Sequence, residues 1–554
     1  MKRKLISIGL ILSVLLSALS VITIPASAAD ASAKLDLYDG ETLVGSYTNV
    51  QKALDAVTKD GMTLKQTADI WARNQLILWF NTCAYDITFD GNGFKMNYYP
   101  DKTVGYGLFE IGSGITGDIL FRNLQVTLTD DTNTGSECYF GEFSAAGTIT
   151  FDDCTYHGFR GALNVKSGTV NLINCNFSVD FGSVIRTDND NATVNIHSGT
   201  YTATPDKSTS WYAGTCHIHR GTLNVYGGSI VGIDGEAIHT VRNGQAAFAP
   251  VLNLFGGYIT SDASTGTMSS AWGKSTWNIY GGTVVNTGTG YALYPQDAQS
   301  VNVWNGNFHV QETTAFCFFG AASAPSYIYG GIFTGGKKAY RVLSPADRKE
   351  DYSYPANTKT IAYGNYYNPI MTVGAQVRLS EDGTNGIRFT STIKKGNQSA
   401  YQNITALIDE GTTLSYGTLI APKDSVTPGE FTSDALKTAG KLCLDIPAKS
   451  GITETDEQIT LRAAMIGIRD GNKAREFAAV SYIKATIQGA EVFFYSCYIP
   501  EDNARSIRGI ATAALNDLQA VQSDEYAYAV TVEGETMYSP YSPALRAILE
   551  GYLA

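Results

Sequence analysis

TLNVYGGSI at residues 222–230, VLNLFGGYI at 251–259 and TWNIYGGTV at 276–284 are three copies of one short pattern. Each copy alternates polar and apolar residues before a glycine-rich turn, which is typical of a β-strand. Copies recur at intervals of about 21 to about 32 residues, the repeat length of stacked solenoids. They begin at Asp86, Asp118, Thr148, Thr169, Thr193, Thr222, Val251, Thr276, Ser300 and Pro325. The sequence therefore predicts a solenoid of about ten rungs, roughly 50 Å long at the usual strand spacing.

Within each copy, side chains alternate between the core and the outside of the predicted solenoid. Leu223 and Val225 would face the core, for example, and Asn224 would face outward. Asparagine recurs at this outward position, at Asn171, Asn195, Asn224, Asn253, Asn278 and Asn302. Because stacked identical amides can hydrogen-bond along the axis of such an array, we interpret this column as structural rather than ligand-binding.

A second outward column follows the asparagines by two positions and is mostly aromatic. It consists of His197, Tyr226, Phe255, Tyr280, Trp304 and Tyr329. Exposed aromatic rings in a strip are apolar surface that needs a reason, and pyranose sugars pack their C–H faces on such rings. We therefore take the five aromatic members as candidate ligand-binding residues. The alternative is that the rings stack on one another and stabilise the sheet.

Each repeat also contains a short strand ahead of the asparagine strand, as in SVIRTD from Ser183 and GTCHIHR from Gly214. Period-two alternation places two columns of these strands on one outer face, which we call the polar stripe. The first column reads Asn164, Arg186, His217, His239, Gly273 and Tyr294, and the second reads Lys166, Asp188, His219 and Val241. Arg220 and Arg242 lie next to the stripe in sequence.

The polar stripe contains groups that could cleave a polysaccharide. Elimination at a uronate needs a base and a cation that neutralises the carboxylate, and Ca²⁺ would be the cofactor if the protein is such a lyase. Glycoside hydrolysis instead needs two carboxyl groups. The candidate catalytic residues are His217, His239, Arg186 and Asp188, and the candidate ligand contacts are His219, Arg220, Arg242 and Tyr294. The alternative is that these polar side chains only keep the outer face soluble.

Eight cysteines in 554 residues are too few for a disulfide scaffold. Cys154 and Cys175 occupy the same position in adjacent copies. Stacked rungs lie about 4.8 Å apart, within the Cα separation that a disulfide tolerates. The sequence leaves two alternatives open: a disulfide between this pair, or two reduced cysteines that fill a column of the core.

The chain begins with the pattern of a secretory signal peptide over residues 1–28. Three basic residues precede an apolar stretch from 5 to about 24, and Ala26, Ser27 and Ala28 supply a cleavage site. An uncleaved membrane anchor is the alternative, and no second apolar run of spanning length follows. The net charge of −12, without a basic cluster, argues against nucleic acid and anionic lipid as partners. We expect a secreted protein, extracellular or on the cell surface, with no transmembrane segment in the mature chain.

Residues 34–345 resemble the right-handed parallel β-helix proteins of the pectin-lyase-like superfamily. The resemblance lies in a short cap helix expected at 47–57, the segment ITFDGNGF from Ile87, and the repeated Asn-apolar-x-Gly-Gly turns. It implies an all-β fold. The superfamily includes polysaccharide lyases, glycoside hydrolases, adhesins and non-catalytic surface proteins, so the resemblance does not select an activity.

Residues 346–372 lack the repeat and are expected to form a linker, and residues 373–554 a β-sandwich-like module. The module resembles one found on secreted proteins of Gram-positive bacteria, through GAQVRL from Gly374, SYGTLIAP from Ser415 and AVSYIKA from Ala479. No activity comes with that resemblance. Further strands are expected at GIRFTSTI, ITALID and ITLRAAMIGI, starting at 386, 404 and 459, and one amphipathic helix from 503 to about 522.

Taken together, these patterns predict a protein that binds extracellular polysaccharide through the face of a β-helix. A long, uniform face suits an extended polymer, and the aromatic column could supply stacking contacts. The first alternative is a polysaccharide lyase or glycoside hydrolase acting on plant or host glycans through the polar stripe. The second is a non-catalytic structural adhesin or spacer.

Overall fold

The computed structural model describes residues 35–554 with short interruptions. The segments outside the described residues are 74–77, 100–106, 129–138, 160, 206–213, 241–246, 271–273, 296–297, 305, 312–315, 320–325, 329–331, 336–337, 342–359, 363–369, 380–382, 396–399, 427–430, 450–451, 497 and 499–502. The predicted signal peptide, Arg242, Gly273, Tyr329 and most of the predicted linker therefore lie outside the described residues. Among the residues that are described, no helix has the length and apolar character needed to span a membrane.

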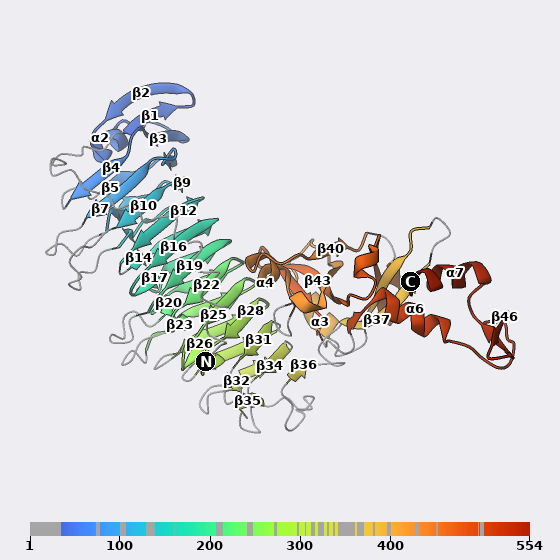
Figure 1. Ribbon diagram of the computed structural model, residues 1–554. Coiled ribbons are helices and arrows are strands. Elements are labelled where there is room, and N and C mark those ends of the chain that lie inside the picture. Colours follow the sequence, from blue (N-terminus) through green and yellow to red (C-terminus); the bar gives the residue numbers. More distant parts are fainter. Residues whose placement is uncertain are drawn as a thin grey trace, which may run out of the picture.

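The front of the chain is a parallel β-solenoid whose walls are three long sheets (Figure 1). Sheet A contains, in order, β2 (Thr42–Tyr47), β1 (Leu35–Asp39), β3 (Met62–Gln66), β6 (Ile87–Asp90), β9 (Ile119–Arg122), β12 (Thr148–Asp152), β15 (Gly168–Ile173), β18 (Ala192–Ile196), β21 (Thr222–Val225), β24 (Val251–Leu254), β27 (Thr276–Ile279), β30 (Ser300–Val303) and β33 (Ser326–Ile328). Each of the predicted repeat starts falls within one residue of a strand of this sheet, which confirms the repeat. Only the pairings of β1 with β2 and β3 are antiparallel in sheet A.

The other two sheets are formed by the strands that follow and precede each sheet A strand. Sheet B contains β4 (Ile70–Arg73), β7 (Lys95–Tyr99), β10 (Gln125–Leu128), β13 (Thr155–Gly158), β16 (Cys175–Val179), β19 (Gly199–Ala203), β22 (Ser229–Gly232), β25 (Tyr258–Ser261), β28 (Thr283–Asn286), β31 (Asn307–Val310), β34 (Ile332–Gly335) and β36 (Thr360–Ala362). Sheet C contains β5 (Leu78–Cys83), β8 (Phe109–Ile115), β11 (Gly141–Phe143), β14 (Gly161–Val165), β17 (Ser183–Thr187), β20 (Gly214–Ile218), β23 (Glu236–Thr240), β26 (Gly266–Ser270), β29 (Tyr291–Pro295), β32 (Phe316–Phe319) and β35 (Lys338–Arg341). The double glycine, in the repeats that contain one, thus lies at the corner between sheets A and B.

The alternation of sheet A separates a continuous apolar core from an outer asparagine column. Leu223, Val225 and their counterparts in the neighbouring rungs are buried in one core cluster. On the outer face, Asn195 donates to Asn171 over 2.8 Å, Asn224 to Asn195 over 2.7 Å, and Asn253 to Asn224 over 2.8 Å. Asn278 and Asn302 continue the ladder at 2.9 and 3.0 Å. The structural interpretation of this column is confirmed.

The first rungs are closed by a short helix, as expected for a solenoid whose end would otherwise expose its core. Helix α2 (Val50–Asp55) is shorter than the predicted 47–57 and buries Val50, Ala53 and Leu54 in the solenoid core. Its N-cap, Asn49, accepts a hydrogen bond from the backbone N–H of Lys52, which is the usual role of an asparagine at this position.

Cys154 and Cys175 are free and fully buried, so the disulfide considered between them is not formed. Each thiol points to backbone carbonyls of its own and the preceding rung: Cys154 to Phe121 at 3.5 Å, and Cys175 to Phe151 at 3.5 Å. Burial and the neighbouring thiol raise the pKa of Cys154, which keeps it protonated. Here the alternative of two reduced cysteines filling a core column is correct, because small thiols pack well in an apolar interior.

The C-terminal module consists of two antiparallel sheets that pack face to face. One contains β37 (Ile370–Arg378), β38 (Gly386–Lys394), β42 (Gln458–Ile466) and β41 (Thr453–Glu454); the other contains β40 (Leu444–Pro447), β39 (Ser415–Pro422), β43 (Phe477–Ile487), β44 (Ala490–Tyr495) and β45 (Ala504–Arg505). Ile387 and Phe389 of one sheet share a buried cluster with Ile420 and Ala479 of the other. The predicted β-sandwich-like architecture is therefore confirmed.

The helices of the module differ from the prediction. They are α3 (Ala400–Thr405), α4 (Ser433–Thr438), α6 (Ile507–Leu515) and α7 (Pro543–Gly551), and a hairpin of β46 (Tyr528–Val532) and β47 (Glu535–Ser539) precedes α7. The strand predicted at ITALID is wrong, because Tyr401, Ile404 and Ile408 pack on one cluster at helical spacing. The predicted helix at 503–522 is shorter, and α7 packs against it through Leu549 and Leu515.

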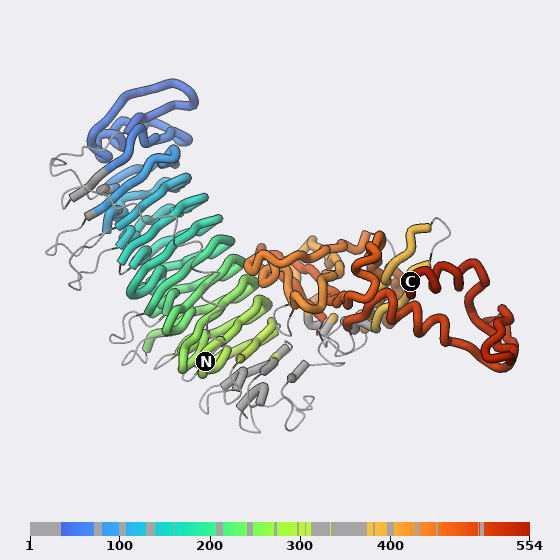
Figure 2. Tube along the Cα trace, viewed as in Figure 1, coloured from blue at the N-terminus to red at the C-terminus, as the bar shows by residue number. Residues whose placement is uncertain are grey.

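The module projects from the side of the solenoid rather than from its end (Figure 2). Its helix α4 and strand β44 contact the corner between sheets A and B, where Phe255 and Tyr280 join a buried cluster with Val492 and Phe494. The two parts thus meet at an angle, with the glycine turns on the inside of this angle.

Candidate functional site

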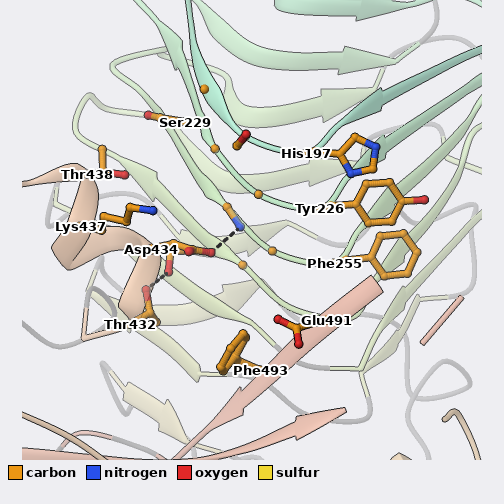
Figure 3. A pocket seen from close by; sticks show the side chains of 18 of the residues that line it. His197, Tyr226, Ser229, Phe255, Thr432, Asp434, Lys437, Thr438, Glu491 and Phe493 are labelled. Atoms are coloured by element: carbon orange, nitrogen blue, oxygen red, sulfur yellow. Dashed lines mark hydrogen bonds between the residues drawn. The ribbon is translucent and has the colours of Figure 1, made fainter. Parts of the chain in front are cut away.

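The aromatic column forms a stack along the solenoid axis (Figure 3). Ring centroids are 4.8 Å apart for His197 and Tyr226, 5.0 Å for Tyr226 and Phe255, and 5.1 Å for Phe255 and Tyr280. Interplanar angles of 12°, 10° and 7° mean that the faces of neighbouring rings cover one another. The prediction that Tyr226, Phe255 and Tyr280 present open ring faces as a platform is therefore wrong. The alternative, that the rings stack on one another, is correct.

The module covers the later members of this stack. Phe255 is 1% exposed and Tyr280 is 7% exposed, because both pack against the module, and Trp304 packs partly against the same cluster. Gln488 of the module also donates to the Tyr280 hydroxyl over 3.4 Å. These rings hold the two parts of the protein together, whereas Tyr226, one rung earlier, is only partly buried against the same cluster, and His197 is exposed.

A cleft of about 520 Å³ lies where the module meets the solenoid; we call it the junction cleft. Its floor is the series of glycine turns, its flank on the sheet B side is helix α4, and β44 crosses one end (Figure 3). The lining residues are Asn174, His197–Thr200, Tyr226–Ser229, Phe255–Gly257, Gly282, Thr283, Thr432, Asp434, Lys437, Thr438, Glu491, Phe493 and Tyr495. Clefts of this size at domain junctions are the usual location of ligand sites.

Two hydrogen bonds fix α4 on the glycine turns. The Asp434 carboxylate accepts from the backbone N–H of Gly257 over 3.0 Å, and the hydroxyls of Thr432 and Thr283 are 3.1 Å apart. Gly257 has a φ of +94°, and a Cβ at Gly256 would lie 2.6 Å from the Tyr226 carbonyl oxygen. Only glycine permits this turn, and the turn is what exposes its N–H to an acceptor.

The preceding rung repeats the same turn without Asp434. Gly228 occupies the position of Gly257, since Ser229 is in register with Tyr258, and its φ is +85°. Gly228 lines the junction cleft, and its backbone N–H has no acceptor within the described part of the chain. A buried or half-buried N–H normally finds a partner, so this group is a donor for a ligand or for water.

The charges at the junction cleft are nearly balanced. Asp434 and Glu491 contribute carboxylates, and Lys437 contributes an ammonium group. Lys484 pairs with Glu491 at 2.5 Å. Burial lowers the pKa of His197, so its ring is neutral at pH 7, and burial raises the pKa of Tyr226, so its hydroxyl stays protonated. The cleft therefore has hydrogen-bonding groups of both kinds but no net field that would select a charged ligand.

The polar stripe is a continuous column on the outer face of sheet C. Register pairs join Glu142 to Asn164, Asn164 to Arg186, Arg186 to His217, His217 to His239, His239 to Ser269, and Ser269 to Tyr294. The position assigned to Gly273 is held by Ser269, because strand β26 begins at Gly266. The side chains that the sequence brought together are thus neighbours in space, with that one correction.

Glu236, on the same strand as His239, is the hydrogen-bond partner of that histidine. His239 Nδ1 lies 2.5 Å from the Glu236 carboxylate and 2.9 Å from Ser269 Oγ, and Thr265 donates to Glu236 over 2.5 Å. Burial alone would raise the pKa of Glu236, but His239 and the hydroxyls of Ser269 and Thr265 lower it. Serine and carboxylate share one ring nitrogen, so the group is not a nucleophilic triad, in which they occupy opposite nitrogens.

Asp188 connects two other members of the stripe. It lies 3.1 Å from Arg186 Nη2 and 3.2 Å from His219 Nδ1, and Arg186 also donates to the Tyr139 hydroxyl over 3.3 Å. Burial would raise the pKa of Asp188, but His219 and Arg186 lower it. Burial lowers the pKa of His219, and Asp188 offsets only part of that effect. The rings of His217 and His219 meet edge to face, with centroids 4.1 Å apart.

Burial limits what the polar stripe can contact. Arg186 and His239 are 7% and 8% exposed, and His217 and His219 are at most 1% exposed. These side chains face away from the core, but they are too buried to touch a polymer in solution. The prediction that they contact one directly is therefore wrong for this conformation. No cluster of metal-binding side chains occurs among the described residues.

The remaining predicted site residues lie at the edges of these two regions. Arg220 pairs with Asp190 at 3.4 Å and places its guanidinium 4.1 Å above the Phe248 ring. Tyr294 is half-buried and stacks on Tyr291 at 5.1 Å. The residues that the sequence did not indicate are those of α4 and β44, because nothing in their local pattern shows that they contact the glycine turns.

In comparisons with protein-family models, with curated proteins and with solved structures, nothing matches this chain.

Proposed function

We propose that this protein binds an extracellular, uncharged polysaccharide in the junction cleft. The observation that carries the proposal is the repeated turn amide: Asp434 uses the N–H of Gly257, and the equivalent N–H of Gly228 lines the cleft with no acceptor among the described residues. A sugar hydroxyl can accept this hydrogen bond, and the neighbouring Tyr226 hydroxyl and Lys437 ammonium group supply further polar contacts.

The charge of the protein supports an uncharged ligand. The chain has a net charge of −12, and the cleft has two carboxylates opposed by Lys437 and Lys484. The net negative charge of the protein would repel a polyuronate, and the cleft offers no excess of positive charge to bind it. We also propose, from the sequence resemblance alone, membership of the pectin-lyase-like superfamily for the solenoid and a Gram-positive origin for the module.

The test is affinity electrophoresis of the mature protein through gels that contain xylan, mannan, β-glucan, dextran or polygalacturonate. We expect retardation by at least one neutral polysaccharide and none by polygalacturonate. Thr200 is exposed in the cleft, and Thr200→Trp would fill it. This variant should weaken retardation by about tenfold or more, equal to about 1.4 kcal/mol.

Thr155→Trp is the matched control. Thr155 is also exposed on sheet B, two rungs earlier in the same register column as Thr200, and it does not line the cleft. A second pair is Lys437→Met with Lys441→Met, since both lysines are exposed near α4 but only the first lines the cleft. If no neutral polysaccharide retards the protein, or if both members of a pair behave alike, the proposal is wrong.

A further inference from the structure

We infer that the junction cleft binds the end of a polysaccharide chain and excludes internal segments of that chain. This inference rests on the proposed function and adds the class of ligand. The starting observation is that the module covers the later glycine turns of the solenoid and leaves the earlier ones open. A polymer that followed the glycine turns would therefore meet an obstacle at a fixed rung.

The obstacle is strand β44 together with the start of α4. Phe255 is 1% exposed beneath the module, and Val492 of β44 lies so close to the turn that a Cβ on Gly281 would be 3.4 Å from its Cγ1. The Val492 side chain therefore lies over this turn, and the module covers the corner at this rung.

The turn at Gly228 lies one rung before the turn that Asp434 occupies. Asp434 occupies the N–H of Gly257, and the N–H of Gly228 is the next one toward the N-terminus. Glu491 and Phe493 of β44 line the cleft at the same end (Figure 3). The terminal sugar of a bound chain would thus have Gly228 beneath it and the module in front of it.

The opposite end of the cleft is open. Its lining there consists of Asn174, His197, Ser198 and Thr200, and both His197 and Thr200 are exposed. The first ring of the aromatic stack, His197, is also at this end. A chain can leave in this direction along the earlier rungs, so the cleft fixes a terminus and leaves the rest of the polymer outside.

The experiment measures the number of protein molecules bound per polysaccharide chain by sedimentation velocity. The probe is the neutral polysaccharide with the strongest retardation, separated into a short and a long size fraction of known mean length. We expect one protein molecule per chain in both fractions, and loss of binding in Thr200→Trp but not in Thr155→Trp.

Two results would contradict this inference in different ways. A bound number that rises in proportion to chain length means that internal segments bind, which overturns end recognition and keeps the proposed function. Absence of binding to every polysaccharide of the panel overturns the proposed function and the inference with it. Because sedimentation also reports the shape of the free protein, a misfolded variant would be recognised.

Discussion

The outer columns of sheets A and C are stacked in the same way, but they differ in composition and in the origin of their hydrogen bonds. The sheet A column repeats asparagine, and each amide bonds to the next amide along the axis. The polar stripe varies in residue type along the axis, apart from the adjacent His217 and His239. Its members bond within the stripe, as His239 does to Ser269, and also to Glu236 and Tyr139 outside it. The asparagine column is uniform because it repeats one residue, whereas the stability of the polar stripe depends on individual pairs of side chains.

The largest effect is expected for Glu236→Ala in the polar stripe. The substitution removes the carboxylate that the buried His239 ring shares with the exposed Thr265 hydroxyl, and leaves His239 Nδ1 with Ser269 Oγ alone. The expected loss of unfolding free energy is about 2 kcal/mol, since a hydrogen bond to a charged group contributes about 1.5–3 kcal/mol. Urea unfolding followed by tryptophan fluorescence measures it, because Trp277 lies in the solenoid core next to this site.

Glu236→Gln is the control for that change, because it keeps an acceptor of the same size and should cost clearly less. Equal losses for the two variants would show that the carboxylate charge, rather than the acceptor, stabilises this part of the stripe. If Glu236→Ala cost less unfolding free energy than removal of a single asparagine in sheet A, the expected difference between the two columns would be contradicted.

A smaller effect is expected for Asn224→Ala in the uniform column. Asn224 donates to Asn195 and accepts from Asn253, so the substitution interrupts the ladder at one rung. The position is half-buried, and water can reach the groups that are left, so we expect a loss of about 1 kcal/mol. The same urea experiment measures it. Asn176→Ala, at an exposed position of sheet B, should change stability by less than about 0.5 kcal/mol.

The smallest effect concerns pH, and the polar stripe should show it through His219. The pKa of His219 is lowered by burial, so the unfolded chain binds a proton more readily than the folded one. Stability should therefore fall as the pH drops below the ordinary histidine pKa of about 6.5 and until it passes the folded value. Asp188 offsets part of the burial effect, which keeps the change small.

His219→Gln should flatten the decrease in unfolding midpoint between neutral pH and mildly acidic pH. His157→Gln is the matched control, because the His157 side chain is 52% exposed on sheet B. A pH profile that both variants leave unchanged would mean that the acid sensitivity has another origin, such as the loss of charge on Asp188 or Glu236 at lower pH.

The sequence was sufficient for features whose cause is local and repeated. The strands of sheet A, the asparagine ladder and the shared column of Cys154 and Cys175 follow from identical residues at identical positions in successive copies. The sequence left open whether the two cysteines are reduced, and the structure shows that they are. The stripe could be aligned wherever a large polar residue marked the register, and the alignment failed at GTMSS, where small residues made Gly273 and Ser269 equally acceptable. Strand ITALID failed for a similar reason, since short apolar runs fit both a strand and a helix.

The junction cleft could not have been found in this way. Asp434 and Gly257 are 177 residues apart, and the aspartate stands in an ordinary first helical turn that gives no sign of its partner. The aromatic column was visible in the sequence, but whether its rings face solvent, each other or another domain depends on where the module docks. That choice is made by packing between distant surfaces, which no local pattern encodes.

The glycine corner that receives Asp434 also has a consequence for the reach of the molecule. Because every rung has the same rise, the count of rungs before Gly257 alone sets how far the capped tip at α2 stands from the module. Duplication or deletion of one repeat in that stretch would lengthen or shorten this arm by about 4.8 Å while leaving the docking contacts intact. The length of this arm can therefore change in steps of one rung without altering the contacts between the solenoid and the module.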